Sequence, residues 1–444
     1  MYRLAFAIAV MSVVATVLAQ HHEVAKLLSD DGAPGDRFGY SVAISGTTAV
    51  VGAHADDNDN GSGSGSVYLF DTFTGQQIAK LVPNDGDLFD SFGISVAVSG
   101  TTAVVGVPND DEAGTNSGSA YLFDTVSGEQ IAKLIRFDGA EDDRFGISVA
   151  ISGTTVVVGV YKDDDSGVDS GSAYLYEVGT FVPIAKLVPD DGAAEDRFGI
   201  SVAISGTTVV VGADKDDDIH SNAGAAYLFD TVTGQQIAKL LPSDGWREDR
   251  FGNSVAISGT TAIVGASRAD TDDGLGAGSA YLFDTVTGEQ IAKLLPNDGA
   301  EHDRFGISVA ISGNTAVVGA DYDDDNGIYS GSAYLFDTIS GQQIAKLLPA
   351  DGAASDQFGG AVAISDTRAV VGAWDDDDIG SAYVFDASPP CPSDLTHDGL
   401  VDTRDFLFFL NAWTTSDPVA DWNGDGTVNS QDFIAYLNDW VAGC

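Results

Sequence analysis

The sequence predicts an all-β, seven-bladed β-propeller over residues 23–387 and a small α-helical module over residues 391–444. A Phe-Gly pair recurs every 53 or 54 residues, each interval holds four short apolar runs, and the pattern ends after its seventh copy. A fixed period of this length is typical of an array of one supersecondary unit. Seven units of four strands indicate a propeller. The pairs are Phe38-Gly39, Phe92-Gly93, Phe145-Gly146, Phe198-Gly199, Phe251-Gly252, Phe305-Gly306 and Phe358-Gly359.

The four runs of each interval, as in SVAISG, TTAVVGA, SAYLFD and QIAKLL, are rich in Val, Ile, Ala and Tyr. Gly, Ser, Thr and Asp separate them, so they are predicted to be strands, here called A to D. The seventh interval lacks the last run, but an orphan copy stands at residues 24–28, ahead of the first Phe-Gly pair. We expect this N-terminal strand to complete the last blade and close the ring, because an open array would expose two sheet edges.

Acidic residues are concentrated in two of the loop types. The chain carries 67 Asp and Glu against 20 Lys and Arg, a net charge of −47. Most of these carboxylates fall in the B–C and D–A loops, which share one face of a propeller with antiparallel blades. Such a face repels nucleic acid and anionic membranes and attracts cations or basic proteins.

This acidic face has two interpretations. It is a solvated surface, or its B–C loops bind calcium, because six of them read Asp-x-[Asp/Glu]-x-Gly and alternating oxygen ligands before a glycine turn suit that ion. The candidate ligands are Asp57, Asp59, Asp110, Glu112, Asp163, Asp165, Asp270, Asp272, Asp323, Asp325, Asp376 and Asp378. The fourth loop has Asp216 and Asp218 but His220 in place of glycine.

An Asp also stands two positions before every Phe-Gly pair, as Asp36 does before Phe38. Because it recurs in every blade, we expect a structural hydrogen bond or ion pair. The Phe is expected to pack between blades, and the Gly to allow close backbone entry into strand A.

The C-terminal module contains an internal duplication. DLTHDGLVDTRDFLFFLNAW is followed 27 residues later by DWNGDGTVNSQDFIAYLNDW. Each copy opens as a twelve-residue calcium loop with oxygen ligands at alternate positions and Gly at the sixth. A helix is predicted after each loop, at residues 406–413 and 433–440. The predicted Ca²⁺ ligands are Asp394, Thr396, Asp398, the Leu400 carbonyl, Asp402 and Asp405 in the first loop, and Asp421, Asn423, Asp425, the Thr427 carbonyl, Asn429 and Asp432 in the second.

The remaining signals concern export and boundaries. Residues 1–19 have a basic start, an apolar stretch and a terminal Ala, which predicts a signal peptide and a secreted, extracellular or cell-surface protein. No later segment is apolar over the length of a membrane span. Residues 388–390 are a short linker. Cys391 and Cys444, the two cysteines, bracket the module and are predicted to form a disulfide.

The pattern DRFG-x-SVAISG-x-x-AVVGA…SGSAYLFD resembles FG-GAP repeats, the blades of integrin α-chain propellers, and is closest to the bacterial variety. The resemblance implies a non-catalytic ligand-binding or adhesion disc with its ligand on the face of the B–C and D–A loops. Integrin-type calcium sites lie between strands A and B, where this chain has only SGTT, so they do not carry over. The duplicated loop-helix resembles a type I dockerin. That implies a cohesin-like partner contacted by positions ten and eleven of each loop, here Thr403, Arg404, Ser430 and Gln431.

These observations favour an exported, non-catalytic binding or adhesion protein. The propeller would recognise a glycan or a protein, and the calcium-loaded tail would dock on a cohesin-type partner. The alternative is an enzyme of extracellular polysaccharide degradation, a hydrolase or lyase, because dockerins most often accompany such enzymes. A third hypothesis is a structural spacer without a ligand. No candidate catalytic residue stands out, because the blades are nearly interchangeable.

Overall fold

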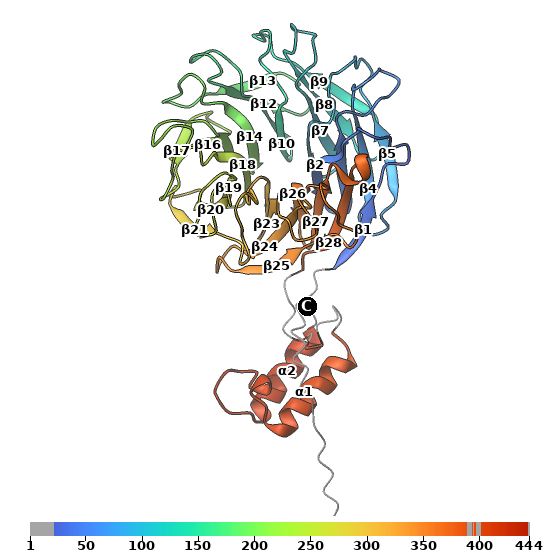
Figure 1. Cartoon of the computed structure of the whole chain (residues 1–444), viewed down its shortest axis with the longest axis vertical. Helices are drawn as coiled ribbons and strands as arrows, with labels where there is room; N and C mark the ends of the chain where they lie inside the picture. The colour runs from blue at the N-terminus through green and yellow to red at the C-terminus, as the bar shows by residue number, and fades with distance from the viewer. Residues whose placement is uncertain (1–21, 389–392, 394, 397–400, 443–444) are drawn as a thin grey trace, which may run out of the picture. The chain divides into compact units, whose positions relative to one another are not determined.

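The structure, a computed structural model, describes residues 22–388, 393, 395–396 and 401–442. The described residues divide into two compact units, a larger one with residues 22–388 and a smaller one with residues 393, 395–396 and 401–442. The larger unit is the predicted seven-bladed propeller, and Figure 1 shows its four-stranded sheets arranged around a common axis. In the described residues, no helix is both long and apolar enough to cross a membrane.

Every blade is an antiparallel sheet whose strands follow the order A-B-C-D. The A strands are β2 (Phe38–Ser45), β6 (Ser95–Ser99), β10 (Ser148–Ser152), β14 (Phe198–Ser205), β18 (Phe251–Ser258), β22 (Val309–Ser312) and β26 (Phe358–Ser365). The B strands are β3 (Thr48–Ala53), β7 (Thr102–Val107), β11 (Thr155–Val160), β15 (Thr208–Ala213), β19 (Thr261–Ala266), β23 (Thr315–Ala320) and β27 (Arg368–Ala373). The C strands are β4 (Ser66–Asp71), β8 (Ser119–Asp124), β12 (Ser172–Glu177), β16 (Ala225–Asp230), β20 (Ser279–Asp284), β24 (Ser332–Asp337) and β28 (Ser381–Asp386). The D strands are β5 (Gln77–Leu81), β9 (Gln130–Leu134), β13 (Pro183–Leu187), β17 (Gln236–Leu240), β21 (Gln290–Leu294), β25 (Gln343–Leu347) and, for the last blade, β1 (Glu23–Leu27).

The predicted ring closure is confirmed. Strand β1 pairs antiparallel with β28, with Lys26 opposite Tyr383 and Leu27 opposite Ala382. The strand begins and ends one residue earlier than the sequence suggested. Its pairing covers the outer edge of β28, so every described blade has the same four strands.

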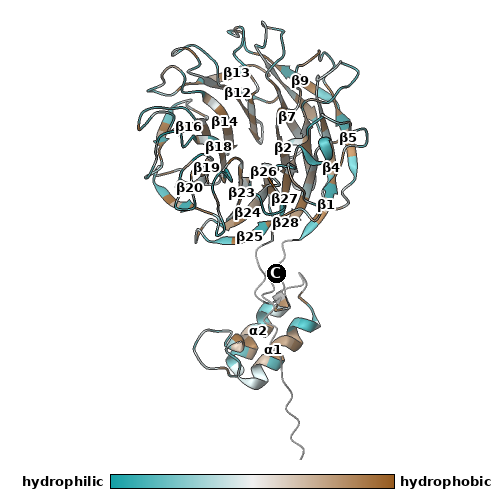
Figure 2. Cartoon of the chain, in the orientation of Figure 1, coloured by the Kyte–Doolittle hydropathy of each residue, from teal (hydrophilic) through white to brown (hydrophobic). Residues whose placement is uncertain are grey.

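The core lies between neighbouring blades. B and C strands are buried along nearly their whole length, because both of their faces pack on adjacent sheets. A strands line a narrow central channel with small and branched apolar side chains from every blade. Figure 2 shows this gradient, with brown inner strands and teal on the D strands and loops.

The Phe-Gly pair has the structural role that the repeat predicted. Phe38 is fully buried in a cluster that includes Val384 of the last blade, and its ring meets those of Tyr68 and Phe70 edge-on at centroid distances of 5.4 and 5.7 Å. Gly39 has φ of +90°, and a Cβ there would lie 2.1 Å from the carbonyl oxygen of Ser381. Only glycine allows this close approach between blades.

The smaller unit contains two helices, α1 (Thr403–Thr415) and α2 (Ser430–Ala442), and a 3₁₀ turn, η2 (Pro418–Ala420). A further 3₁₀ turn, η1 (Asp376–Asp378), lies in the last B–C loop of the propeller. Both helices begin three residues before their predicted starts. For α1 the reason is a capping box, in which Asp402 and Asp405 exchange hydrogen bonds with backbone N–H groups of the first turn. Phe409 and Tyr436 stack at a centroid distance of 4.0 Å to form the core.

Candidate functional site

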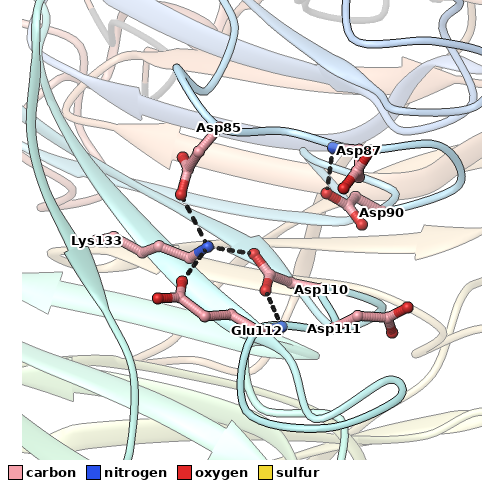
Figure 3. Close-up of a pocket in the computed structure, with 7 residues that line it drawn as sticks. All are labelled: Asp85, Asp87, Asp90, Asp110, Asp111, Glu112 and Lys133. Carbon is pink, nitrogen blue, oxygen red and sulfur yellow. Dashed lines mark hydrogen bonds and ion pairs between the residues drawn. The ribbon is translucent and has the colours of Figure 1, made fainter.

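In six of the seven blades, a lysine from strand D joins the B–C loop to the D–A loop. In the second blade, Lys133 Nζ lies 2.7 Å from Asp110 Oδ2 and 2.6 Å from Glu112 Oε2, both in the B–C loop (Figure 3). It also lies 3.0 Å from Asp85 Oδ2 in the D–A loop. The Tyr121 hydroxyl, on strand C, donates to Asp85 and Asp110 at 3.1 and 3.2 Å. One ammonium and one phenol therefore hold the two loop types together.

The electrostatics of this cluster favour the charged lysine. Burial alone would lower the pKa of Lys133, but its hydrogen bonds to Asp110 and Glu112 raise it above the usual value. Burial raises the pKa of Tyr121, so the phenol stays a hydrogen-bond donor. A permanently charged ammonium between carboxylates is a structural clamp and not a proton acceptor.

The same lysine clamp recurs around the ring. The lysines that reach a buried B–C Asp are Lys26 with Asp376, Lys80 with Asp56, Lys133 with Asp110, Lys186 with Asp163, Lys239 with Asp216 and Lys346 with Asp323, at 2.7–3.0 Å. Blade five differs, because Ala269 takes the place of the buried Asp and Lys293 pairs with Asp244, at 2.6 Å.

The clamp explains where the predicted propeller ligands lie. Asp163, Asp323 and Asp376, like Asp110, are the buried partners of the lysines. Their companions Glu112, Asp165 and Asp325 contact the same ammonium groups from more exposed positions. Asp378 lies in η1.

Blades one and five depart from the register that the sequence pattern suggested. The buried residue of the first B–C loop is Asp56, so Asp57 and Asp270 occupy the next position along. Their carboxylates accept backbone N–H groups, from Gly63 at 2.7 Å and Gly276 at 2.9 Å. Asp59 and Asp272 lie further along the same loops.

A cavity of about 320 Å³ opens beside Lys133, lined by six carboxylates and this lysine (Figure 3). The excess negative charge of such a cavity attracts a second cation. Among the residues that the structure describes, no three His, Cys, Asp or Glu side chains converge as a ligand set. Calcium in the B–C loops therefore stays a prediction.

The Asp that precedes each Phe-Gly pair makes the turn hydrogen bond that its recurrence predicted. In blade six, Asp303 Oδ2 accepts the N–H of Ala300 at 2.7 Å, and the other blades repeat this contact. Burial, together with the nearby charge of Asp323, raises the pKa of Asp303 to about 6. Burial likewise raises the pKa values of Asp90, Asp196 and Asp249 to about 6.

In the C-terminal unit, the last residue of each predicted calcium loop is fully buried and organises its own loop. Asp432 accepts the N–H groups of Asn423 at 3.0 Å and Asn429 at 2.7 Å. Asp405 accepts those of Thr396 and Asp402, both at 2.8 Å. The third, ninth and twelfth loop positions are thus linked identically in the two copies.

The second loop also has a feature that suits a cation. Asp421 Oδ2 accepts the N–H of Gly426 at 2.8 Å, while Oδ1 is buried and has no hydrogen-bond partner in the described part of the chain. A buried carboxylate oxygen without a donor fits a ligand of a hard cation. Asp425 and the Thr427 carbonyl belong to the same loop.

The two helices are tied to each other's loops. The Trp413 indole donates to the Asn429 carbonyl at 2.8 Å, and the Trp440 indole donates to the Asp402 carbonyl at 3.0 Å. The four predicted partner residues, Thr403, Arg404, Ser430 and Gln431, are exposed in the first turns of α1 and α2. Arg404 also pairs with Asp402 at 2.9 Å. Other predicted features lie outside the described residues: the signal peptide, Asp394, Asp398, Leu400, Cys391 and Cys444.

Sequence reasoning missed the strand-D lysines and strand-C tyrosines of the clamp. Both recur in every copy of QIAKL and AYLFD or its close variants, so recurrence was the available signal. Their partners lie in loops far along the chain, 48 residues away for Lys133 and Asp85 and 325 for Lys26 and Asp351, which a strand pattern does not disclose.

Comparison with known families agrees with this architecture. The FG-GAP repeat model matches residues 21–70, 76–123, 129–176, 181–229, 235–283, 289–336 and 342–385. Each match runs from a strand D to the next strand C, one strand out of phase with the blades, which is why the first match supplies the strand that completes the last blade. No curated protein matches the chain significantly. Seven matches that cover most of the sequence place this chain in the FG-GAP repeat family.

Proposed function

We propose that the protein is an exported, non-catalytic binding protein in which the propeller recognises a glycan or protein and the C-terminal unit docks on a cohesin-type partner in a calcium-dependent way. The observation that carries the proposal is the contrast between a repeated scaffold and variable loops. The lysine clamps, the Phe-Gly contacts and the Asp turns recur around the ring, while the loop tips between them differ from blade to blade. Binding sites are commonly built on variable loops held by a rigid scaffold.

The tail half of the proposal depends on the second loop. The Asp421 Oδ1 atom, buried without a hydrogen-bond partner in the described residues, supports an oxygen-ligand cation site, and Asp405 and Asp432 order the two loops in the same way. Calcium would hold both loops folded, and the exposed first turns of α1 and α2 would then present Thr403, Arg404, Ser430 and Gln431 to the partner.

The experiment uses residues 20–444 against immobilised polysaccharides, extracellular proteins and cohesin modules, each with calcium and with a chelator. We expect retention on one propeller ligand without release of soluble sugar, and capture by a cohesin that disappears on chelation. Release of sugar would instead identify an enzyme. Failure to bind any surface would favour the structural spacer.

A further inference from the structure

A groove between blades five and six brings aromatic and cationic side chains together on the acidic face. It encloses about 820 Å³, within the range of pockets that hold small ligands. The D–A loops that enter the two blades and their B–C loops form its walls. Its aromatic and cationic lining residues are Trp246, Arg247, Arg268, His302, Arg304, Tyr322 and Tyr329.

The lining of this groove carries three arginines and two carboxylates. Glu248 accepts a hydrogen bond from Asn222 at 2.8 Å and Asp270 accepts the N–H of Gly276 at 2.9 Å. Arg247 and Arg268 are exposed, and neither makes an ion pair with any residue that the structure describes. Two guanidinium groups are thus free to bind a carboxylate in two-point geometry.

Blade five makes this possible by losing acidic charge. The position that holds a buried Asp in the other blades is Ala269, and the residue before it is Arg268. In blade four the corresponding residue is Lys215. Its backbone N–H donates to the Asp196 carbonyl at 3.3 Å, and the backbone N–H of Arg268 donates to the Asp249 carbonyl at the same distance.

Fixed aromatic rings lie beside the two arginines. Trp246 is 60% exposed, and its ring packs edge-on against His220 at a centroid distance of 4.3 Å. Tyr329 is 44% exposed, and its ring centroid lies 4.4 Å from that of Tyr322. The Arg304 guanidinium lies over the Tyr322 ring, 4.3 Å from its centroid. Exposed rings held in place in this way offer flat apolar surfaces at little entropic cost.

We propose that this groove binds an acidic oligosaccharide that contains uronic acid units. The sugar carboxylates would pair with Arg247 and Arg268, and the C–H faces of the sugar rings would pack on Trp246 and Tyr329, because both surfaces leave water. An acidic peptide would satisfy the arginines but not the flat rings. The net negative charge of the protein does not prevent binding, since charges beyond about 8 Å are largely screened at physiological salt.

This inference rests on the proposed binding function and names the ligand class. The test titrates residues 20–444 with oligogalacturonate, its methyl ester, a neutral oligosaccharide of equal length and poly-glutamate, without calcium. We expect oligogalacturonate to bind at least tenfold more tightly than the other three. Arg247→Ala, Arg268→Ala and Trp246→Ala should each weaken it about tenfold, since a lost charge-assisted pair or buried ring is worth more than 1.4 kcal/mol. Lys215→Ala, the matched change in blade four, should stay within about twofold of the parent on the same scale.

Three results would overturn the inference: equal binding of the methyl ester, equal binding of poly-glutamate, or an equal loss in Lys215→Ala and Arg268→Ala. The outcome is separable from that of the wider proposal. If a panel ligand is retained and Arg268→Ala leaves its binding unchanged, the groove assignment fails and the binding function stands. If neither the panel nor oligogalacturonate is retained, the binding function itself fails.

Discussion

Lys133 Nζ and Asp110 Oδ2 lie 2.7 Å apart, with the lysine side chain 15% exposed and the aspartate 5% exposed. The pair joins strand D to the B–C loop, and other blades repeat it. Blade five replaces the aspartate with Ala269 and so provides an internal comparison.

Lys133→Met should destabilise the propeller by about 3 kcal/mol, because it leaves a buried carboxylate without its counter-charge. Lys293→Met is the matched control. Its partner Asp244 is 48% exposed, so the loss should be about 1 kcal/mol or less. Urea unfolding of both variants measures the difference. Equal losses would mean that the buried aspartate does not depend on the lysine.

Leu27→Asp should prevent stable ring closure. Leu27 is fully buried against Phe38 and Val384, so a carboxylate there should cost about 4 kcal/mol or more. Leu28→Asp, at the next residue, changes a side chain that is 51% exposed and should cost about 0.5 kcal/mol or less. Thermal unfolding and size-exclusion chromatography report both effects. A Leu27→Asp variant as stable as its neighbour would contradict closure by β1.

Asp303→Asn should alter how stability depends on pH. The pKa of Asp303 is about 6 in the folded protein, above its usual 3.8, so the folded state holds the proton more tightly and stability falls as pH rises from about 4 to 6. The Asn variant lacks this titration. It should match the parent at pH 4 and exceed it at pH 7.5 by on the order of 1 kcal/mol after allowance for solvent screening.

Thermal melts across this pH range test the prediction. Asp59→Asn removes the same formal charge from an exposed position and should not change the slope. A parallel change in both variants would assign the effect to net charge.

Asp421→Asn should reduce the calcium affinity of the tail at least about tenfold, because an amide donor would replace either the oxygen bonded to Gly426 or the one that has no partner. Asp417→Asn is the control, since it removes a carboxylate at the start of η2 and keeps an N-capping side chain. Calorimetric titration of the full chain compares the two. A loss of affinity shared by both variants would place the effect outside the loop.

The sequence was sufficient for the fold because each blade repeats one pattern, and the missing final run matched the orphan strand at residues 24–28. It was less informative about the loops. The Asp-x-[Asp/Glu]-x-Gly pattern aligned Asp57 with Asp163, although the buried equivalent is Asp56. An extra loop residue shifts a pattern by one position without changing its composition. The Arg247–Arg268 groove was equally hidden, because its walls come from four separate loops.

Because β1 pairs with β28, the ring can close only after the last strand of the propeller has been synthesised. A chain that stops before Ser381 lacks the strand β28 on which β1 docks, and its last sheet keeps bare edges that invite aggregation or proteolysis. A full-length chain can therefore form a closed ring, whereas a truncated chain cannot. Protease resistance should appear late in synthesis, once β28 has been made and has paired with β1.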